Sequence, residues 1–251
     1  MLLVPFFIGL IAAGRWQVQA IMLLAAILSL YASRYPLVLW ARSRFEMFPQ
    51  GGLFTSISSL IIGLSLGAVL VFRFGLWFLI PLAGTGLLLL MAHLMLVRHR
   101  RERTEAGEFL GIATLALTAP AAYYTSTGDM SILAFFLWFL GVAYSGVSVF
   151  YVKMKLAYSS PRPRPSKREG RSLILALVFY QTITIGSIVL LSSLALLPLW
   201  TIMAFAPITV QVVAGTVKRG RPFNVRRLGF ILVGQSTGFV ILIAAAFSLA
   251  R

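Results

Sequence analysis

The chain has 251 residues, of which 59% are hydrophobic and only 11% are charged. A soluble domain usually carries about 25% charged residues, so this composition excludes a soluble globular protein. The absence of Cys excludes disulfides, a thiol nucleophile and a thiolate metal site, and the presence of only two His argues against a His-built metal centre. We therefore expect no metal site.

Nine apolar stretches follow one another along the chain. They are residues 1–13, 16–33, 53–72, 74–97, 109–124, 130–151, 172–194, 197–217 and 228–249. A helix needs about 20 apolar residues to cross the hydrocarbon core, and most of these stretches approach that length. The first stretch is too short, and it fits a half-helix, a signal peptide or the remainder of a longer helix. The sequence therefore predicts an all-α, polytopic transmembrane bundle of about nine helices that forms a single domain.

Basic residues are concentrated in four connections between these stretches. Nineteen of the 22 Lys and Arg lie at residues 34–44, 98–103, 153–171 and 218–227. Cationic loops stay on the cytoplasmic side because they are costly to translocate. This pattern predicts a bacterial cytoplasmic (inner) membrane protein with its N-terminus in the cytoplasm and its C-terminus outside. Because the charge lies in juxtamembrane loops, we expect anionic lipid head groups as partners rather than nucleic acid.

A weak internal repeat relates the two halves of the chain. A shift of 118 residues places the basic run at residues 100–103 on residues 218–221, and a shift of 113 places Tyr31 on Tyr144 and Arg42 on Lys155. Membrane folds are often built from such repeats, which would give a four-plus-four arrangement with one helix added. Chance similarity between basic loops is the alternative explanation.

The connection at residues 153–171 alternates Pro with Arg, a pattern that favours an extended, solvated segment. We expect a mobile cytoplasmic loop that lies over anionic lipid. A flap over a ligand that carries phosphate is the functional alternative.

Candidate ligand-binding residues occur where helices are expected to meet the basic connections. They are Arg34, Arg42, Arg44, Arg103, Glu105, Glu108, Tyr144, Lys153 and Lys155. Guanidinium groups match phosphate oxygens, although Arg beside Tyr and Trp is also ordinary interfacial anchoring.

Glu105 and Glu108 are three residues apart, so both can face one side of a helix start, where the helix dipole favours carboxylates. They would either pair with nearby Arg or position a substrate or cation. We expect Arg42, Arg44, Lys153 and Lys155 to converge on one cavity mouth, with the two Glu at its rim.

Polar residues inside the apolar stretches are few and uncharged near the middle. They include His93, Tyr144, Ser148, Gln181, Thr182, Gln211, Gln235 and Ser236. Such groups usually join neighbouring helices by hydrogen bonds. Because ion-coupled transporters place ionisable residues at mid-membrane, this pattern argues against one.

Two stretches resemble the bacterial YwiC-like family of uncharacterised membrane proteins. They are residues 1–6 (MLLVPF) and residues 103–113 (RTEAGEFLGIA), and the similarity continues through Ala119-Pro120 to Tyr123-Tyr124. In that family a Lys/Arg-Glu-His-Gly motif precedes the first stretch, whereas here Met1 occupies the place of an internal Met. The resemblance implies that the natural chain begins upstream of Met1 and that the missing part supplies Glu and His at the cytoplasmic interface.

The expected layout also resembles the UbiA-type prenyltransferases, in which Asp-rich motifs after the second and sixth helices hold magnesium and a prenyl diphosphate. The matching connections here contain Arg34, Arg42, Lys153 and Lys155, and neither contains Asp. A magnesium-held diphosphate needs carboxylate ligands. The chain would therefore hold a diphosphate by Arg alone, or it has lost this chemistry.

These observations favour a membrane protein that binds an isoprenoid or other amphipathic lipid in a UbiA-like bundle. An accessory or assembly subunit of an energy-transducing membrane complex is the first alternative, and a transporter is the second. The sequence assigns no cofactor and leaves open whether the protein is an enzyme.

Overall fold

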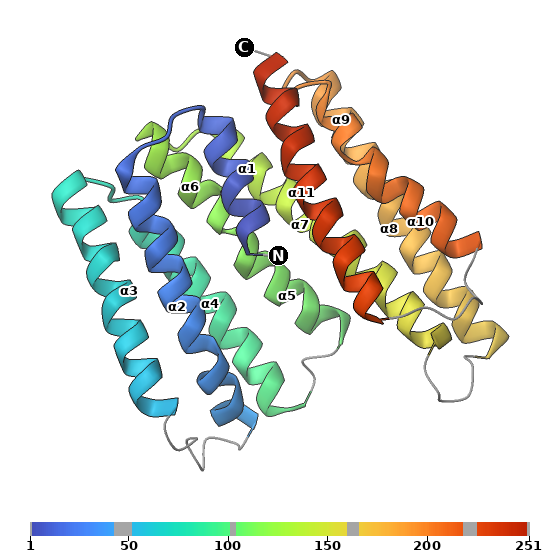
Figure 1. Ribbon diagram of the computed structural model, residues 1–251, viewed down its shortest axis with the longest axis horizontal. Coiled ribbons are helices and arrows are strands. Elements are labelled where there is room, and N and C mark those ends of the chain that lie inside the picture. Colours follow the sequence, from blue (N-terminus) through green and yellow to red (C-terminus); the bar gives the residue numbers. More distant parts are fainter. Residues whose placement is uncertain (1, 43–51, 101–103, 160–165, 218–224, 250–251) are drawn as a thin grey trace. The chain divides into compact units, whose positions relative to one another are not determined.

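A computed structural model describes residues 2–42, 52–100, 104–159, 166–217 and 225–249. Within these ranges all regular secondary structure is α-helical, which confirms the predicted all-α bundle (Figure 1). Six described helices are long and apolar enough to cross a membrane: α2 (Val18–Arg42), α3 (Gly52–Phe74), α4 (Leu79–Arg98), α7 (Ile132–Ser159), α8 (Lys167–Ser193) and α11 (Val225–Leu249). The shorter ones are α1 (Leu3–Ala13), α5 (Glu105–Ala116), α6 (Thr118–Thr127), α9 (Thr201–Ala204) and α10 (Ala206–Val217).

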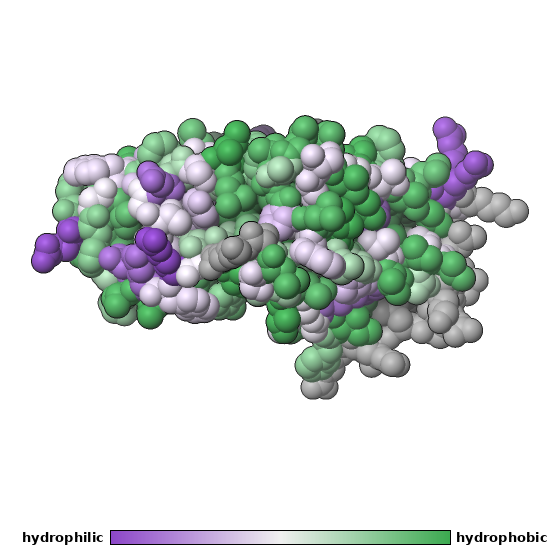
Figure 2. All heavy atoms as spheres, turned by 90° about the horizontal axis from the view of Figure 1, so that it is seen from above, coloured by the Kyte–Doolittle hydropathy of each residue, from purple (hydrophilic) through white to green (hydrophobic). Residues whose placement is uncertain are grey.

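The chain divides into two compact units, with the boundary inside α7. The N-terminal unit comprises residues 2–139, and the C-terminal unit comprises residues 140–251. Large hydrophobic side chains are exposed along the long helices of both units, as with Phe54, Leu88 and Phe179. Figure 2 shows one face, seen from above Figure 1, on which hydrophobic and neutral residues predominate and the strongly hydrophilic residues gather in small groups. The hydrophobic side chains that are exposed along the helices suit contact with lipid rather than water.

In the N-terminal unit, α2 packs along α3, α4 packs on α5, and α1 packs on α6. Gly9 of α1 lies against the backbone carbonyl of Ala119 in α6, so closely that a Cβ would overlap the carbonyl oxygen. α1 ends at Gly14, whose φ of 67° closes the helix with a left-handed cap. The buried core of this unit includes Phe6, Leu10 and Leu70.

The stretch at residues 109–124, predicted as one segment, is divided between α5 and α6, with Leu117 between them. Pro120 has no N–H to donate to the carbonyl of Ala116, which interrupts the ladder of helical hydrogen bonds. At the same break, the Thr118 hydroxyl donates to the carbonyl of Leu115 at 2.8 Å. The stretch at residues 197–217 is likewise divided, between α9 and α10, two residues before Pro207.

Several helices continue into the connections that were predicted as basic loops. Arg34 and Arg42 lie in α2, which corrects the predicted loop start at Arg34. The helix continues because the residues between them are mostly apolar and an α-helix satisfies its own backbone groups. α7 continues to Ser159, and α8 begins after Ser166, whose side chain forms a capping box with Glu169. The predicted loop at 153–171 is thus shorter, and residues 160–165 lie outside the described ranges.

In the C-terminal unit, three aromatic rings join α7, α11 and the break between α9 and α10. Tyr144 stacks on Phe239 with ring centroids 4.0 Å apart, and Phe205 meets both rings edge-on. Glycines allow two further close contacts, because Gly146 faces the ring of Tyr180 and Gly215 faces the ring of Tyr151. This packing fixes α9 and α10 against the long helices of the unit.

Candidate functional site

A polar cluster joins α2, α4 and α5 in the N-terminal unit. The Nη2 atom of Arg34 lies 3.4 Å from Nε2 of His93, and Nδ1 of His93 lies 3.2 Å from the backbone oxygen of Gly107. His93 is only 8% exposed, whereas Arg34 is half-buried. His93 therefore connects a cation on α2 to the first turn of α5.

The contacts of His93 determine its tautomer. A guanidinium can only donate hydrogen bonds, so Nε2 of His93 must accept and cannot carry a proton. A backbone carbonyl can only accept, so Nδ1 must carry the proton and donate to Gly107. Both contacts are satisfied by the neutral imidazole with its proton on Nδ1. The Arg34 charge is therefore held by a neutral partner and is not cancelled by it.

The start of α5 completes the surroundings of this cluster. The Thr104 side chain caps the helix by accepting from the Gly107 N–H at 3.3 Å. A Cβ added to Gly111 would lie 3.7 Å from His93 Cε1 and 3.9 Å from Arg34 Nη2, so the two side chains meet over this glycine. Glu105 and Glu108 both occur in the first turn of α5, as predicted.

Arg34 also contacts an aromatic ring of its own helix. Its guanidinium carbon lies 5.8 Å from the ring centroid of Tyr31, three residues earlier on α2. The side chain of Arg42 and the whole of Arg44 and Arg103 lie outside the described residues, so their predicted roles stay predictions.

The remaining predicted site residues belong to the C-terminal unit. Lys155 of α7 is buried and Lys153 is half-buried, whereas Tyr144 is only 4% exposed. Tyr144 packs among aromatic rings and its hydroxyl lies 3.5 Å from Ser236 Oγ, so its contacts are those of a core residue that joins α7 to α11. The predicted convergence of Arg42 and Arg44 with Lys153 and Lys155 involves both units, and it stays a prediction.

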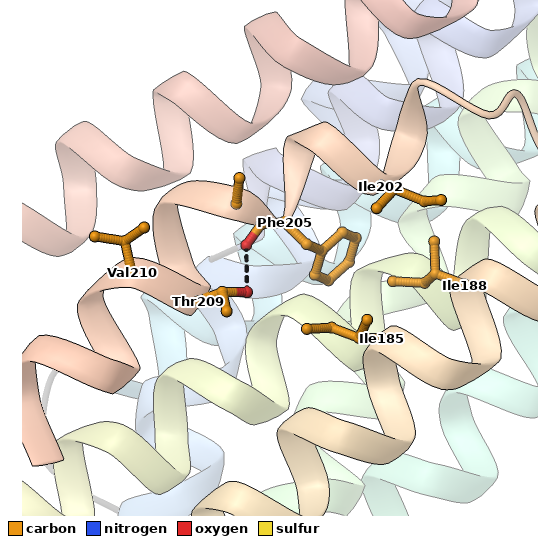
Figure 3. Close-up of a pocket in the computed structure, with 7 residues that line it drawn as sticks. Ile185, Ile188, Ile202, Phe205, Thr209 and Val210 are labelled. Atoms are coloured by element: carbon orange, nitrogen blue, oxygen red, sulfur yellow. Dashed lines mark hydrogen bonds between the residues drawn. The ribbon is translucent and has the colours of Figure 1, made fainter.

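A separate apolar groove lies between α8 and the break between α9 and α10 (Figure 3). Its volume is about 260 Å³, and it is lined by Ile185, Ile188, Ile202, Phe205, Ala206, Thr209 and Val210. Thr209 supplies the one hydroxyl among these side chains and donates it to the carbonyl of Phe205 at 2.8 Å. The groove suits a hydrocarbon chain and offers very little to a charged ligand.

Sequence reasoning recognised His93 as a residue that joins helices, and the structure confirms this. It did not place His93 beside Arg34, which is 59 residues away in the chain. The available signal was that His93 is the one His inside an apolar stretch, near the basic end of its helix. Among the described residues there is no cluster of three or more His, Asp or Glu that could hold a metal ion.

This fold, with its long apolar helices, defines a multi-pass all-α membrane protein. The family model described as YwiC-like protein matches residues 1–123, so this part of the chain, which includes Arg34, His93 and the start of α5, is YwiC-like. The resemblance seen in the sequence is thereby confirmed. Comparisons with curated proteins and with solved structures gave no match, and the UbiA-like arrangement stays a prediction.

Proposed function

We propose that this membrane protein binds an isoprenoid or other amphipathic lipid that carries a phosphate head group, and that Arg34 is the head-group ligand. The observation that carries the proposal is the contact between Arg34 and a neutral His93. Because the imidazole is neutral, it does not cancel the positive charge of Arg34, which lies in a half-buried position. A guanidinium in such a position is well suited to the oxygens of a phosphate.

The number of donors supports the same ligand. A guanidinium carries five N–H donors, and the contact with His93 uses one of them. The Tyr31 ring lies beside the carbon of the group rather than accepting a conventional hydrogen bond. Several N–H groups of Arg34 are therefore suited to bidentate binding of phosphate.

The position of the cluster along the helices also favours a lipid. His93 lies five residues before the last residue of α4, which corresponds to about 7.5 Å along the helix. That depth is close to the membrane interface, where lipid head groups lie. Leu89 and Leu90 lie four and three residues before His93 on the same face of α4, and these partly buried apolar side chains would contact the lipid chain.

The test is a titration of detergent-purified protein with farnesyl phosphate, followed by native mass spectrometry. We expect Arg34→Gln to weaken binding about tenfold or more, because a charge-assisted hydrogen bond contributes roughly 1.5–3 kcal/mol. Arg34→Lys should weaken it less, since an ammonium keeps the charge but loses the fork. Arg73→Gln is the matched control, because Arg73 lies exposed in the last turn of α3.

Equal affinity in the wild type and both Arg34 variants would contradict the proposal. A tightly associated protein partner, purified in fixed ratio and without bound lipid, would favour the accessory-subunit alternative instead.

A further inference from the structure

We propose that the groove between α8 and the break between α9 and α10 is a second binding site, and that it takes a lipid alcohol, meaning an apolar chain that ends in a neutral hydroxyl. This site is separate from Arg34 and goes beyond the proposed phosphate binding. It is built entirely within the C-terminal unit.

The groove opens onto a surface that faces lipid. Val210, one of its lining residues, is 68% exposed, and the lining residue Ala206 is exposed as well. The groove is thus continuous with apolar surface that suits contact with hydrocarbon, so an apolar chain can enter from the membrane. Its isoleucine and phenylalanine lining suits such a chain (Figure 3).

A buried amide lies next to this groove. Gln181 is 6% exposed and precedes Ile185 by one turn, which places both on one face of α8. Its Nε2 lies 2.7 Å from the hydroxyl oxygen of Thr209, a lining residue. The amide of Gln181 is therefore adjacent to the groove on the side of Thr209.

The hydrogen bonds around Thr209 determine what this amide offers. The Thr209 hydroxyl donates to the carbonyl of Phe205, so its oxygen accepts from the Gln181 amide N–H. The amide oxygen of Gln181 is then an acceptor, and it is buried with no hydrogen-bond partner among the described residues. An unsatisfied buried acceptor costs about 1–3 kcal/mol, and a ligand O–H would remove that cost.

The depth of Gln181 restricts the ligand to a neutral group. Gln181 lies near the middle of α8, where a charged head group would be strongly disfavoured. A hydroxyl donates one hydrogen bond at a much smaller cost of burial. Gln181 lies behind Thr209 and does not itself line the groove, so the hydroxyl of the alcohol inserts beside Thr209 to reach the amide oxygen while the apolar chain fills the groove.

The test uses a photoreactive farnesol analogue added to the whole protein in nanodiscs, with peptide mapping of the labelled positions. We expect labelling within residues 181–210, displaced by farnesol about three- to tenfold better than by the hydrocarbon farnesene, as one hydrogen bond in a membrane predicts. Gln181→Leu should remove this preference for farnesol. Thr182→Val is the matched control, because Thr182 is exposed and bonds only to its own helix.

A second variant does not depend on the amide. Ala206→Trp fills the groove from an exposed lining position and should abolish the labelling while the helical content stays the same. Labelling that is absent from residues 181–210, that persists in Ala206→Trp, or that farnesol and farnesene displace equally would overturn the proposal. Titration with farnesyl phosphate is a separate measurement, so failure of either site is distinguishable from failure of the other.

Discussion

Two described contacts of His93 have opposite requirements, one with a donor on α2 and one with an acceptor on α5. Imidazole is the one side chain that satisfies both from a single planar ring without carrying a charge. The residue therefore holds three helices together and keeps the Arg34 guanidinium in place. The contacts of His93 with Arg34 and with the Gly107 carbonyl therefore underlie both its expected contribution to stability and its proposed contribution to binding.

Replacing His93 by Leu should destabilise the protein by about 1–3 kcal/mol, because the Gly107 carbonyl loses its donor and Arg34 loses its acceptor. The measurement is thermal unfolding in detergent. His99→Leu is the control, since His99 is exposed at the end of α4. Similar unfolding temperatures for the two variants would contradict the assigned role of His93.

The tautomer of His93 can be tested directly by nitrogen NMR of protein labelled in His. We expect a protonated Nδ1 and an unprotonated Nε2 for the buried ring, because Arg34 cannot accept a hydrogen bond. The exposed His99 provides a reference signal in the same sample. A proton on Nε2 of His93 would show that Arg34 and His93 are not hydrogen-bonded.

Among the described helices of the N-terminal unit, α1 and α6 approach each other closely at a glycine. Gly9 leaves room for the Ala119 carbonyl where any side chain would overlap it. Small residues allow this approach in membranes, where packing rather than the hydrophobic effect holds helices together.

Gly9→Ala should therefore separate α1 from α6 and destabilise the protein by about 1–3 kcal/mol through overpacking. Gly67→Ala in α3 is the matched control, because a Cβ there meets nothing within 4 Å. Thermal unfolding of both variants provides the comparison. An unchanged unfolding temperature for Gly9→Ala would contradict the described packing of α1 on α6.

The existence of the helices was predictable, but several of their ends and breaks were not. Hydropathy predicts an apolar stretch at residues 16–33, which locates α2. The helix itself continues to Arg42 and contains Pro36. A helix satisfies its own backbone beyond the apolar stretch, so charge alone does not mark its end. The helix breaks before Pro120 and Pro207 have a visible cause in the sequence, namely the proline. A hydropathy window averages over about 20 residues, so it shows one apolar stretch where the structure has two helices.

The candidate site was only partly predictable, because the contacts within it depend on how the helices pack. Arg34 and the two Glu of α5 stand out in the sequence as charged residues at apolar boundaries. The contact of Arg34 with His93 depends on how α2, α4 and α5 pack, and no spacing along the chain encodes that packing. The predicted repeat pairs Tyr144 with Tyr31, but Tyr31 is 45% exposed and Tyr144 is buried.

For the whole molecule, the distribution of charged residues predicts the membrane topology. The described connections near Arg73 and Asp129 carry little charge, whereas the basic runs lie at the other helix ends. The positive-inside rule predicts that the basic ends face the cytoplasm, which would place the Arg34 cluster near the cytoplasmic leaflet.

Reporter fusions at Asp129 and within residues 159–166 should therefore report opposite sides of the membrane, with the second site cytoplasmic. A fusion at Arg73 should agree with the one at Asp129. Reports from the same side at Asp129 and at residues 159–166 would show that the predicted topology is wrong.

A density map of the protein in nanodiscs that contain farnesyl phosphate tests most directly whether Arg34 binds an anionic lipid. We expect a phosphate within about 2.7–2.9 Å of the Arg34 guanidinium, with His93 still accepting from the same side chain. We also expect the phosphate density to disappear in Arg34→Gln while the helices stay in place. A map in which Arg34 pairs with a carboxylate of the protein, and in which the lipid phosphate lies elsewhere, would contradict lipid binding at this cluster.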